Sequence, residues 1–573
     1  MKGFMRINTR HTVPWITKRL EIRFFKPLFS IIYGSVCMKL VMMSDTHYIS
    51  RRSCTADAEI DTLNDIAVTE QALRQAAEDG DTVIITGDLT DSGDSYSHED
   101  LAEILRGIKA QGKRVFVIFA THDYRHQKAF VRMYGDSKLK YKSEPWNAPY
   151  FEPENEDFAA LLTDDSKRVL GGGDPAPKLI PALTDLEIWN LYKEFGPDEA
   201  YSSYAQEYCY CVDLDENTRC LMLNDIFRNV ECADISASFS PGCFKWIKQM
   251  VVEAERDGKA IFACSHHPIK PIVSAHRLGA SVKNLRTPYT GHTLADIGVK
   301  LIFVGHTHAS DISFMRSDKG NTICSVMTPS VRFYPPQYRI VDFDGANHKI
   351  SYESVNVRKP QNVDCAEDDL NKYYFRRMYD DYYRDICGKN TVLAKRLRTL
   401  KIGDLYFLVR GNAKLTKAEY EKIKDIKIFD YIINLAFNML DGRRLYTPDS
   451  PEYKFGVALA ALAESVINAQ PFKDIRKKSL QGYTMFDIIE DLLCTDGADN
   501  VSGEIDYTKI PAKPYEPKRP ASHAGEALMA ILFAVVCAAS PLMPPAAIIA
   551  FAAKLYGKQK LVKSEKPAPL MRY

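Results

Sequence analysis

Five short polar clusters in this chain carry residue types that can do chemistry. They are SDTH at 44–47, GDLTD at 87–91, ATHD at 120–123, SHHP at 265–268 and GHTH at 305–308. Six of the thirteen histidines lie inside these clusters. Carboxylate oxygens and imidazole nitrogens without a thiolate form a ligand set that suits manganese, iron or zinc. The clusters therefore predict a site for divalent metal ions.

Each cluster directly follows a short apolar or β-branched run, which is typical of a buried strand. The runs are KLVMM at 39–43, TVIIT at 82–86, VFVIF at 115–119, AIFAC at 260–264 and KLIFV at 300–304. In open α/β sheets the carboxyl ends of the strands border the crevice where ligands bind. We therefore expect clusters from distant parts of the chain to converge on one site.

The clusters hold more ligands than one metal ion needs. The candidates are Asp45, His47, Asp88, His266, His306 and His308. Two divalent ions sharing a carboxylate would hold an activated hydroxide between them and stabilise both oxygens of an in-line displacement at phosphorus. A lone Asp-x-His pair is more often a polar strand end or a buried core histidine than a metal site. Five such clusters after five predicted strands are not expected by chance. The pattern predicts hydrolysis of a phosphate ester.

The elements between the clusters follow an alternating pattern from residue 38 to residue 356. Helical stretches separate the strands; one is expected at 98–110, capped by Ser97 and closed by Gly112. Three turn sequences between alternating strands predict hairpins at DENT (215–218), DKGN (318–321) and DGAN (344–347). These hairpins predict a second, antiparallel sheet. The fold class is therefore α/β (α+β).

In this order the five clusters resemble the motifs of the calcineurin-like metallophosphoesterase superfamily, over about residues 38–356. The compact order and the SHHP and GHTH forms are most similar to bacterial class III cyclic nucleotide phosphodiesterase-like proteins. The resemblance implies a sandwich of two facing sheets flanked by helices. It also implies a dinuclear metal-dependent phosphoesterase that hydrolyses a small phosphodiester or phosphomonoester by attack of a metal-bridging hydroxide.

The resemblance assigns roles to residues by their positions in the motifs. It implies the ligands of two divalent ions (Mn, Fe or Zn): Asp45, His47 and His308 for the first, Asp88 for both, and His266 and His306 for the second. His122 would contact the substrate and assist the leaving group, and Asp123 beside it is the second candidate catalytic residue. His267 is expected to support a ligand rather than to bind metal.

The third cluster departs from the family pattern. The family usually has Gly-Asn-His-Asp or Gly-Asn-His-Glu there, with the Asn oxygen on the second metal, whereas Ala120 and Thr121 precede His122 in this chain. A threonine hydroxyl is a shorter and poorer donor, so Thr121 is a candidate ligand that predicts weak binding of the second ion. The departure leaves an alternative open: a metal-bound, catalytically weak sensor or interaction protein.

Composition limits the partners. The chain has 46% hydrophobic and 26% charged residues with a formal net charge of +1, which excludes a mostly disordered or multi-span membrane chain and disfavours long nucleic acids as partners. Thirteen scattered cysteines without a C-x-x-C pair argue against a disulfide framework or a thiolate zinc site. A small phosphate ester is the expected substrate, and the aromatic stretch at 138–204 is available to stack on a nucleotide base.

The remaining segments are predicted to flank a metallophosphoesterase domain at 38–356. They are a basic N-terminal extension (1–37), a helical accessory domain of unknown partner (357–508), a proline-rich linker (509–526), a hydrophobic segment (527–556) and a basic tail (557–573). Residues 527–553 carry no charge but include Pro541, Pro544 and Pro545. They predict a membrane-associated hairpin or two packed helices. The expected location is cytoplasmic, with attachment to the inner face of the membrane as an option.

Overall fold

The structure of the 573-residue chain is a computed structural model. It describes residues 37–54, 60–91, 93–124, 183–228, 235–269, 288–367, 369–384, 398–442, 446–468 and 500–510. The N-terminal extension up to residue 36, most of the aromatic stretch, nearly all of the linker, the hydrophobic segment and the basic tail lie outside the described residues.

The first of two large sheets has six strands, with β13 and β1 at its centre. Its order is β15 (Ser502–Asp506), β14 (Lys349–Asn356), β13 (Gln337–Asp344), β1 (Met38–Met43), β2 (Thr82–Thr86) and β3 (Arg114–Ile118). Strands β1, β2 and β3 are parallel, and β13 joins β1 in the antiparallel sense. The three parallel strands therefore end at one edge of the sheet, each followed by a polar cluster.

The second sheet has seven strands and is also mixed. Its order is β11 (Asp311–Arg316), β12 (Thr322–Met327), β10 (Leu301–Val304), β9 (Ala260–Cys264), β6 (Thr218–Met222), β5 (Cys209–Asp213) and β4 (Ser202–Tyr204). Strands β12, β10, β9 and β6 are parallel. A separate hairpin joins β7 (Ile226–Arg228) to β8 (Ile235–Ala237). The fourth and fifth polar clusters follow β9 and β10.

The strand period of two divides side chains between the inside and the outside of a sandwich. Leu40 and Met42 of β1 pack between the sheets, in one core with Phe262 and Phe303 of the second sheet. The alternate residue Val41 packs outward, in a core with side chains from three helices: α2 (Ile60–Asp79), α3 (Ser95–Lys109) and α6 (Asp185–Leu191). The predicted sandwich of two sheets flanked by helices is confirmed.

Helices also cover the outer face of the second sheet. Helices α7 (Pro241–Asp257) and α8 (Pro288–Ile297) contribute to a core with β9 and β10. Short 3-10 helices lie at η1 (Arg51–Ser53), η2 (Pro197–Glu199) and η3 (Ala205–Glu207). Among the described residues, no helix combines the length and the apolar character needed to cross a bilayer.

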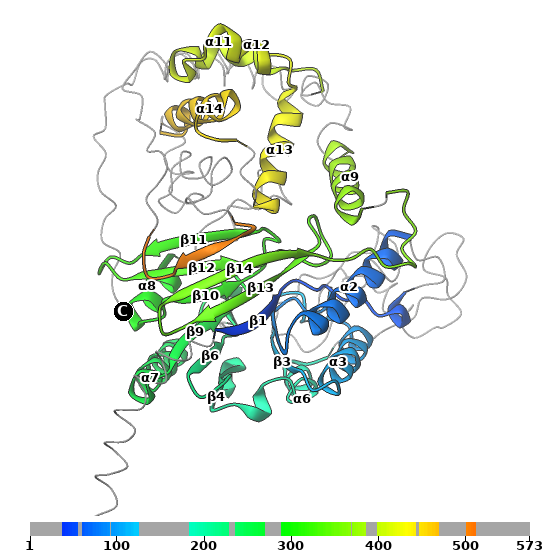
Figure 1. The fold of residues 1–573 in the computed structure, drawn as a ribbon, viewed down its shortest axis with the longest axis vertical. Helices are drawn as coiled ribbons and strands as arrows, with labels where there is room; N and C mark the ends of the chain where they lie inside the picture. The colour runs from blue at the N-terminus through cyan, green and yellow to red at the C-terminus, as the bar shows by residue number, and fades with distance from the viewer. Residues whose placement is uncertain are drawn as a thin grey trace, which may run out of the picture.

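A helical region follows the sandwich. Its members are α9 (Leu370–Tyr382), α11 (Ile402–Ala413), α12 (Lys417–Ile423), α13 (Ile428–Asp441) and α14 (Pro451–Asn468). Figure 1 shows α11, α12, α13 and α14 gathered on one side of the sheets. They share a core that includes Tyr431 and Phe455, while Phe429 and Phe437 of α13 pack in the core of the second sheet. The helical region is therefore docked on the sandwich through α13.

Three expectations about the elements need correction. The predicted hairpins do form, as β5–β6, β11–β12 and β13–β14, but they extend the two mixed sheets instead of making a separate antiparallel sheet. Residues 502–506, placed in the helical accessory domain, form β15 on β14 (Figure 1); only Ile505 of this edge strand is buried, so its alternation is weak. Helix α3 begins at Ser95 and is capped by Asp94, whose carboxylate accepts the Ser97 N–H.

Candidate metal centre

The ends of five strands bring the polar clusters together. Four groups of side chains have ligand atoms within 4.8 Å of one another: Asp45, His47 and His308; Asp45, Asp88 and His266; His266, His267 and His306; and His47, Asp91 and His122. The groups share Asp45, His47 and His266, so they form one continuous site. Two sheets contribute to it, because the first three clusters follow β1, β2 and β3 and the last two follow β9 and β10.

The backbone of the site is strained at the ligand positions. The left-handed region is uncommon for residues with a Cβ, and five candidate ligands adopt it: Asp45 (φ 51°), His47 (φ 42°), Asp88 (φ 48°), His306 (φ 72°) and His308 (φ 58°). Hydrogen bonds between the loops hold this conformation, including Asp45 N–H to Gly87 O at 3.1 Å and His47 N–H to Asp88 O at 2.9 Å. Strain of this kind persists only where the surroundings enforce it, and it concentrates at functional sites.

Two glycines let the loops approach each other. Gly87 has φ +89°, and a Cβ on it would lie 2.8 Å from both the Ala120 Cβ and His266 Nδ1. A Cβ on Gly305 would collide with the side chains of Ser44 and Asp45. Any larger residue at either position would push candidate ligands apart. This requirement explains the glycine that opens the second and fifth clusters.

Asp45 lies at the centre of the first ligand group. Its Oδ1 is 3.2 Å from His308 Nε2 and 3.7 Å from His47 Nε2, and the two imidazole nitrogens are 3.1 Å apart. The other oxygen accepts hydrogen bonds from the Ser44 hydroxyl and, at 2.9 Å, from the His306 N–H. Asp45 Oδ1 is buried and has no hydrogen-bond partner among the described residues. Such an orphaned oxygen beside two imidazoles fits a bound cation.

Asp88 joins the first group to the second. Its Oδ2 is 3.9 Å from His47 Nε2 and 3.1 Å from His266 Nε2. Its Oδ1 accepts the His122 N–H at 2.8 Å. His266 Nδ1 bonds Thr86 O at 2.8 Å, which turns Nε2 toward the two aspartates. His266 Nε2 is buried without a hydrogen-bond partner among the described residues, so the second group also fits a metal ion.

The charges of the centre shift the pKa values of its members. Burial alone would raise the pKa of Asp45, but His266 and His308 hold it well below the usual value. Burial would lower the pKa of His266, but the carboxylates of Asp88 and Asp45 raise it to about 10. The pKa of His47 falls to about 4 because of burial and the nearby His122. A proton therefore occupies His266 near neutral pH when metal is absent, and metal binding must release it.

The third cluster contributes two residues with different surroundings. Thr121 lies beside Asp88, and its hydroxyl donates to Asp88 Oδ1 at 3.4 Å. Asp123 belongs to none of the four groups found among the described residues. Its carboxylate is fully buried and accepts the N–H groups of Thr90 and Ala120 at 2.8 Å each. These contacts join two loops of the site through the Asp123 carboxylate, and the catalytic role expected from its motif position stays a prediction.

Sequence reasoning missed Arg332 and Phe333 in the loop between β12 and β13. Arg332 is buried, and its guanidinium donates to His47 O at 2.7 Å, Asp91 Oδ1 at 2.6 Å and Asp65 Oδ2 at 3.0 Å. The Phe333 ring stacks on His308, with centroids 4.5 Å apart. The loop sequence SVRFYPP contains no metal-ligand type and follows no predicted cluster, so it carried no signal.

Asp225 was missed as well. It follows β6 and bonds the turn after β9: Oδ1 is 2.8 Å from His267 Nδ1, and Oδ2 accepts the Ser265 hydroxyl at 2.9 Å. An acidic residue at the end of an apolar strand was a signal that could have identified it.

A sequence model of the calcineurin-like phosphoesterase family matches residues 38–310. The match runs from β1 to just beyond β10 and includes all five polar clusters. Over these residues, slightly less than half of the chain, the protein is similar to the calcineurin-like phosphoesterases. The match supports a metallophosphoesterase, a class of phosphoric ester hydrolase.

Solved structures give weaker likenesses. A dimetal phosphatase from Danio rerio is 12% identical, with a TM-score of 0.32 over 56% of this chain and 96% of that one. The purple acid phosphatase PPD1 from yellow lupin (Lupinus luteus) seeds is 11% identical, with a TM-score of 0.32 over 57% of this chain and 53% of that one. The similarity to calcineurin-like phosphoesterases therefore rests on the sequence match over residues 38–310. Comparison with curated protein sequences gave no significant match.

Proposed function

We propose that this protein hydrolyses a small phosphomonoester or phosphodiester with the help of two divalent metal ions. The observation that carries the proposal is the position of Asp88, whose Oδ2 lies 3.9 Å from His47 Nε2 and 3.1 Å from His266 Nε2. One carboxylate thus stands between two groups of nitrogen and oxygen ligands. This arrangement suits two neighbouring ions better than one.

The donor set favours manganese, iron or zinc. Asp45, His47, His308 and Asp88 would hold the first ion, while Asp88, His266 and His306 would hold the second. Bound there, two divalent ions would stabilise negative charge at phosphorus and activate water at neutral pH. The protein's part is to fix the ligands, which it does through buried side chains and strained strand ends.

His122 is the residue placed to handle a proton of the substrate. Its Nδ1 bonds Asp91 O at 2.8 Å, so Nδ1 carries hydrogen and Nε2 is the atom that can hold or move a proton. Its ring stands edge-on against His47, with centroids 4.6 Å apart. With a second proton on Nε2, the His122 imidazolium would protonate the leaving oxygen or stabilise its charge.

Substrate choice is the finer part of the proposal. The resemblance to class III cyclic nucleotide phosphodiesterase-like proteins favours a nucleotide, and the net charge of +1 disfavours a long nucleic acid. Membrane association through residues 527–556 stays a prediction, since that segment lies outside the described residues. The partner of the helical region is likewise not identified.

A screen with purified full-length protein tests the proposal. Metal-free protein would be supplied with manganese and assayed on p-nitrophenyl phosphate, bis-p-nitrophenyl phosphate and then 3′,5′-cyclic nucleotides, with His292→Ala as a control for loss of a histidine outside the four groups. Turnover that depends on added metal supports the proposal. Bound metal without turnover of any ester would contradict it and favour the alternative of a metal-bound sensor, for which Thr121 in the third cluster is the motivating feature.

A further inference from the structure

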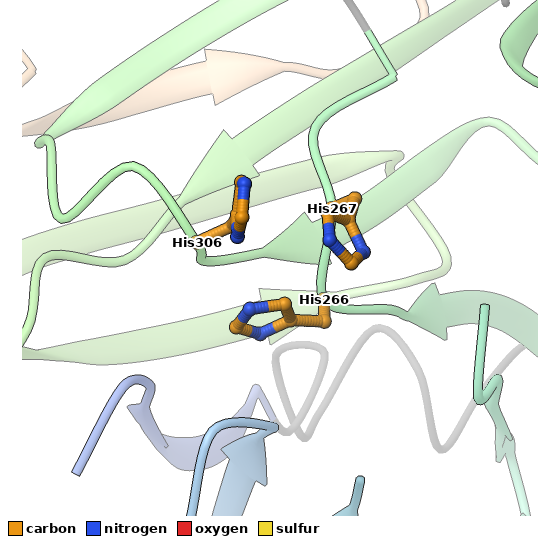
Figure 2. Close-up of side chains that lie close together, drawn as sticks. All are labelled: His266, His267 and His306. Carbon is orange, nitrogen blue, oxygen red and sulfur yellow. The ribbon is translucent and has the colours of Figure 1, made fainter. Parts of the chain in front are cut away.

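The turn after β9 carries two consecutive histidines, His266 and His267, and the sequence pattern assigns only the first to a metal ion. Figure 2 shows His266, His267 and His306 arranged around one space, two from this turn and one from the turn after β10. Their ligand atoms lie within 4.8 Å of one another. The ring centroid of His267 is 4.2 Å from that of His306 and 4.9 Å from that of His266. His267 is thus as close to the second group as the candidate ligands are to each other.

Asp225 fixes the orientation of His267. Asp225 Oδ1 bonds His267 Nδ1 at 2.8 Å, and Oδ2 accepts the His267 N–H at 2.8 Å and the Ser265 hydroxyl at 2.9 Å. Both residues are buried: His267 is 5% exposed and Asp225 is 3% exposed. A carboxylate on one imidazole nitrogen selects the tautomer that offers the other nitrogen as a metal ligand, and metal-binding histidines are commonly supported in this way.

The ligands assigned to the second ion leave coordination positions for water or for a further side chain. Asp88, His266 and His306 would provide three protein ligands, and divalent zinc, for example, takes at least four ligands in all. Thr121, the candidate from the third cluster, directs its hydroxyl to Asp88 Oδ1 at 3.4 Å. That hydroxyl is a poor replacement for the amide oxygen expected at this position.

We propose that His267 is a ligand of the second metal ion through Nε2 and supplies the donor that Thr121 provides poorly. The inference rests on the proposed dinuclear centre, and it concerns coordination rather than hydrolysis. The second ion would then have three imidazoles and one carboxylate, while the first has two imidazoles and two carboxylates. A more nitrogen-rich set suits zinc or iron better than manganese.

Cobalt(II) binding to the metal-free full-length protein tests the assignment directly, because the visible absorption of cobalt(II) reports its ligands. Wild type should bind two equivalents. His267→Ala should bind the first equivalent normally and the second with a changed spectrum and more than about 100-fold more weakly, which exceeds the loss of about 10- to 100-fold that removal of a supporting residue causes. Asp225→Asn should weaken the same equivalent less. His292→Ala, on α8 and in none of the groups, should match wild type.

A rescue separates ligation from a structural role. If Thr121 and His267 serve one coordination position, Thr121→Asn should raise affinity for the second equivalent much more in His267→Ala than in wild type. A merely structural histidine would leave the two gains equal. If His267→Ala does not fold, the cobalt(II) affinities of His267→Gln and Asp225→Asn are compared with that of wild type instead. Circular dichroism monitors the folding of each variant.

Two equivalents bound by a folded His267 variant with wild-type affinity and spectrum would overturn the inference. So would an equal gain in affinity from Thr121→Asn in wild type and in His267→Ala. A different result would contradict the proposed function. Wild-type protein that binds two ions but hydrolyses no ester would contradict that function and leave the assignment of His267 as a ligand intact. Conversely, metal-dependent hydrolysis by a His267→Ala protein with two tightly bound ions would keep the function and reject this ligand.

Discussion

His122 touches the centre without belonging to the ligands assigned to either ion. Its N–H bonds Asp88 Oδ1 at 2.8 Å and its Nδ1 bonds Asp91 O, also at 2.8 Å. The backbone therefore positions it, and its side chain can change without removing an assigned ligand. This separation allows binding and turnover to be measured independently.

We expect His122→Ala to keep the metal content of wild type and to lower kcat by about 100-fold or more, as for loss of a positioned acid. Metal analysis and steady-state kinetics on a nitrophenyl ester check both parts. Loss of metal together with activity would mean that His122 is a ligand, as its grouping with His47 and Asp91 also allows.

At the residue scale, the sequence identified the Asp and His side chains that the fold brings together, because these residues directly follow the predicted strands. It could not predict residues that act through others. Arg332 and Phe333 come from a loop far along the chain, and their contacts with His47 and His308 exist only in the fold. The motif position of Asp123 likewise does not reveal that its carboxylate accepts hydrogen bonds from two backbone N–H groups.

At the scale of elements, the loop between β12 and β13 ties α2 to the site through Arg332. The guanidinium pairs with Asp65 of α2 at 3.0 Å and with Asp91 at 2.6 Å. All three side chains are buried. Removing the Arg332 cation would take an ion-pair partner from both buried carboxylates. The free-energy cost of leaving a buried charge without this partner exceeds the stabilisation that the intact ion pair contributes.

Arg332→Gln should therefore lower the free energy of unfolding by about 3–5 kcal/mol, the usual cost of breaking a buried ion pair. It should also weaken binding of the first metal ion, because His47 O loses its 2.7 Å donor. Urea denaturation and metal titration measure the two effects. The control is Arg256→Gln, which removes an exposed ion pair with Asp257. This substitution should change the free energy of unfolding by less than about 1 kcal/mol. Equal effects of the two substitutions would count against the role of Arg332.

Helix α3 contributes a second buried group, His98. Its Nε2 bonds Asp123 O at 2.7 Å and its Nδ1 lies 3.2 Å from the Tyr192 hydroxyl. Burial lowers the pKa of His98 to about 4, below its ordinary value of 6.5. The unfolded chain therefore binds more protons between these two pKa values, so this group lowers stability as pH falls from about 6.5 toward 4.

Between pH 7.5 and pH 5 the loss from His98 should be about 2 kcal/mol, given 1.36 kcal/mol per pKa unit. His98→Gln can keep a donor for Asp123 O but cannot take up a proton. Between the same two pH values, the free energy of unfolding of this variant should therefore fall by about 2 kcal/mol less than that of wild type. Urea midpoints at the two pH values check this. Identical pH dependence in both proteins would show that His98 does not titrate as its burial implies.

Sequence periodicity was sufficient to predict the strands whose two faces are both covered by other elements. The five apolar runs and the three turn sequences all correspond to strands and hairpins. Sheet membership could not be predicted, because it depends on pairings between distant strands such as β1 with β13. Strand β15 was missed since an edge strand with one buried side chain has almost no periodic signal.

At the scale of the whole molecule, α13 connects the helical region to the sandwich that carries the site. Phe437 is buried and packs edge-on against Tyr334, with ring centroids 5.0 Å apart. Tyr334 follows Phe333, which stacks on His308. Ser310 N–H bonds Leu440 O at 2.9 Å. The helical region and the metal site therefore share one packed core.

Phe437→Ala should lower the free energy of unfolding by about 3–5 kcal/mol, the usual cost of truncating a buried phenylalanine. Phe407→Ala is the matched control, because that ring on α11 is 59% exposed and its loss should cost little. Thermal or urea unfolding gives the comparison. Similar small effects from both would contradict docking of the helical region through α13.

In the proposed function, Asp88 bridges two metal ions, and both ions are required for ester hydrolysis. The most direct measurement is a manganese titration of metal-free protein, with bound metal and hydrolysis of bis-p-nitrophenyl phosphate followed in the same samples. We predict little activity at one bound equivalent, full activity at two, and neither activity nor the second equivalent in Asp88→Asn. Full activity at one equivalent, or an active Asp88→Asn protein, would contradict the dinuclear assignment.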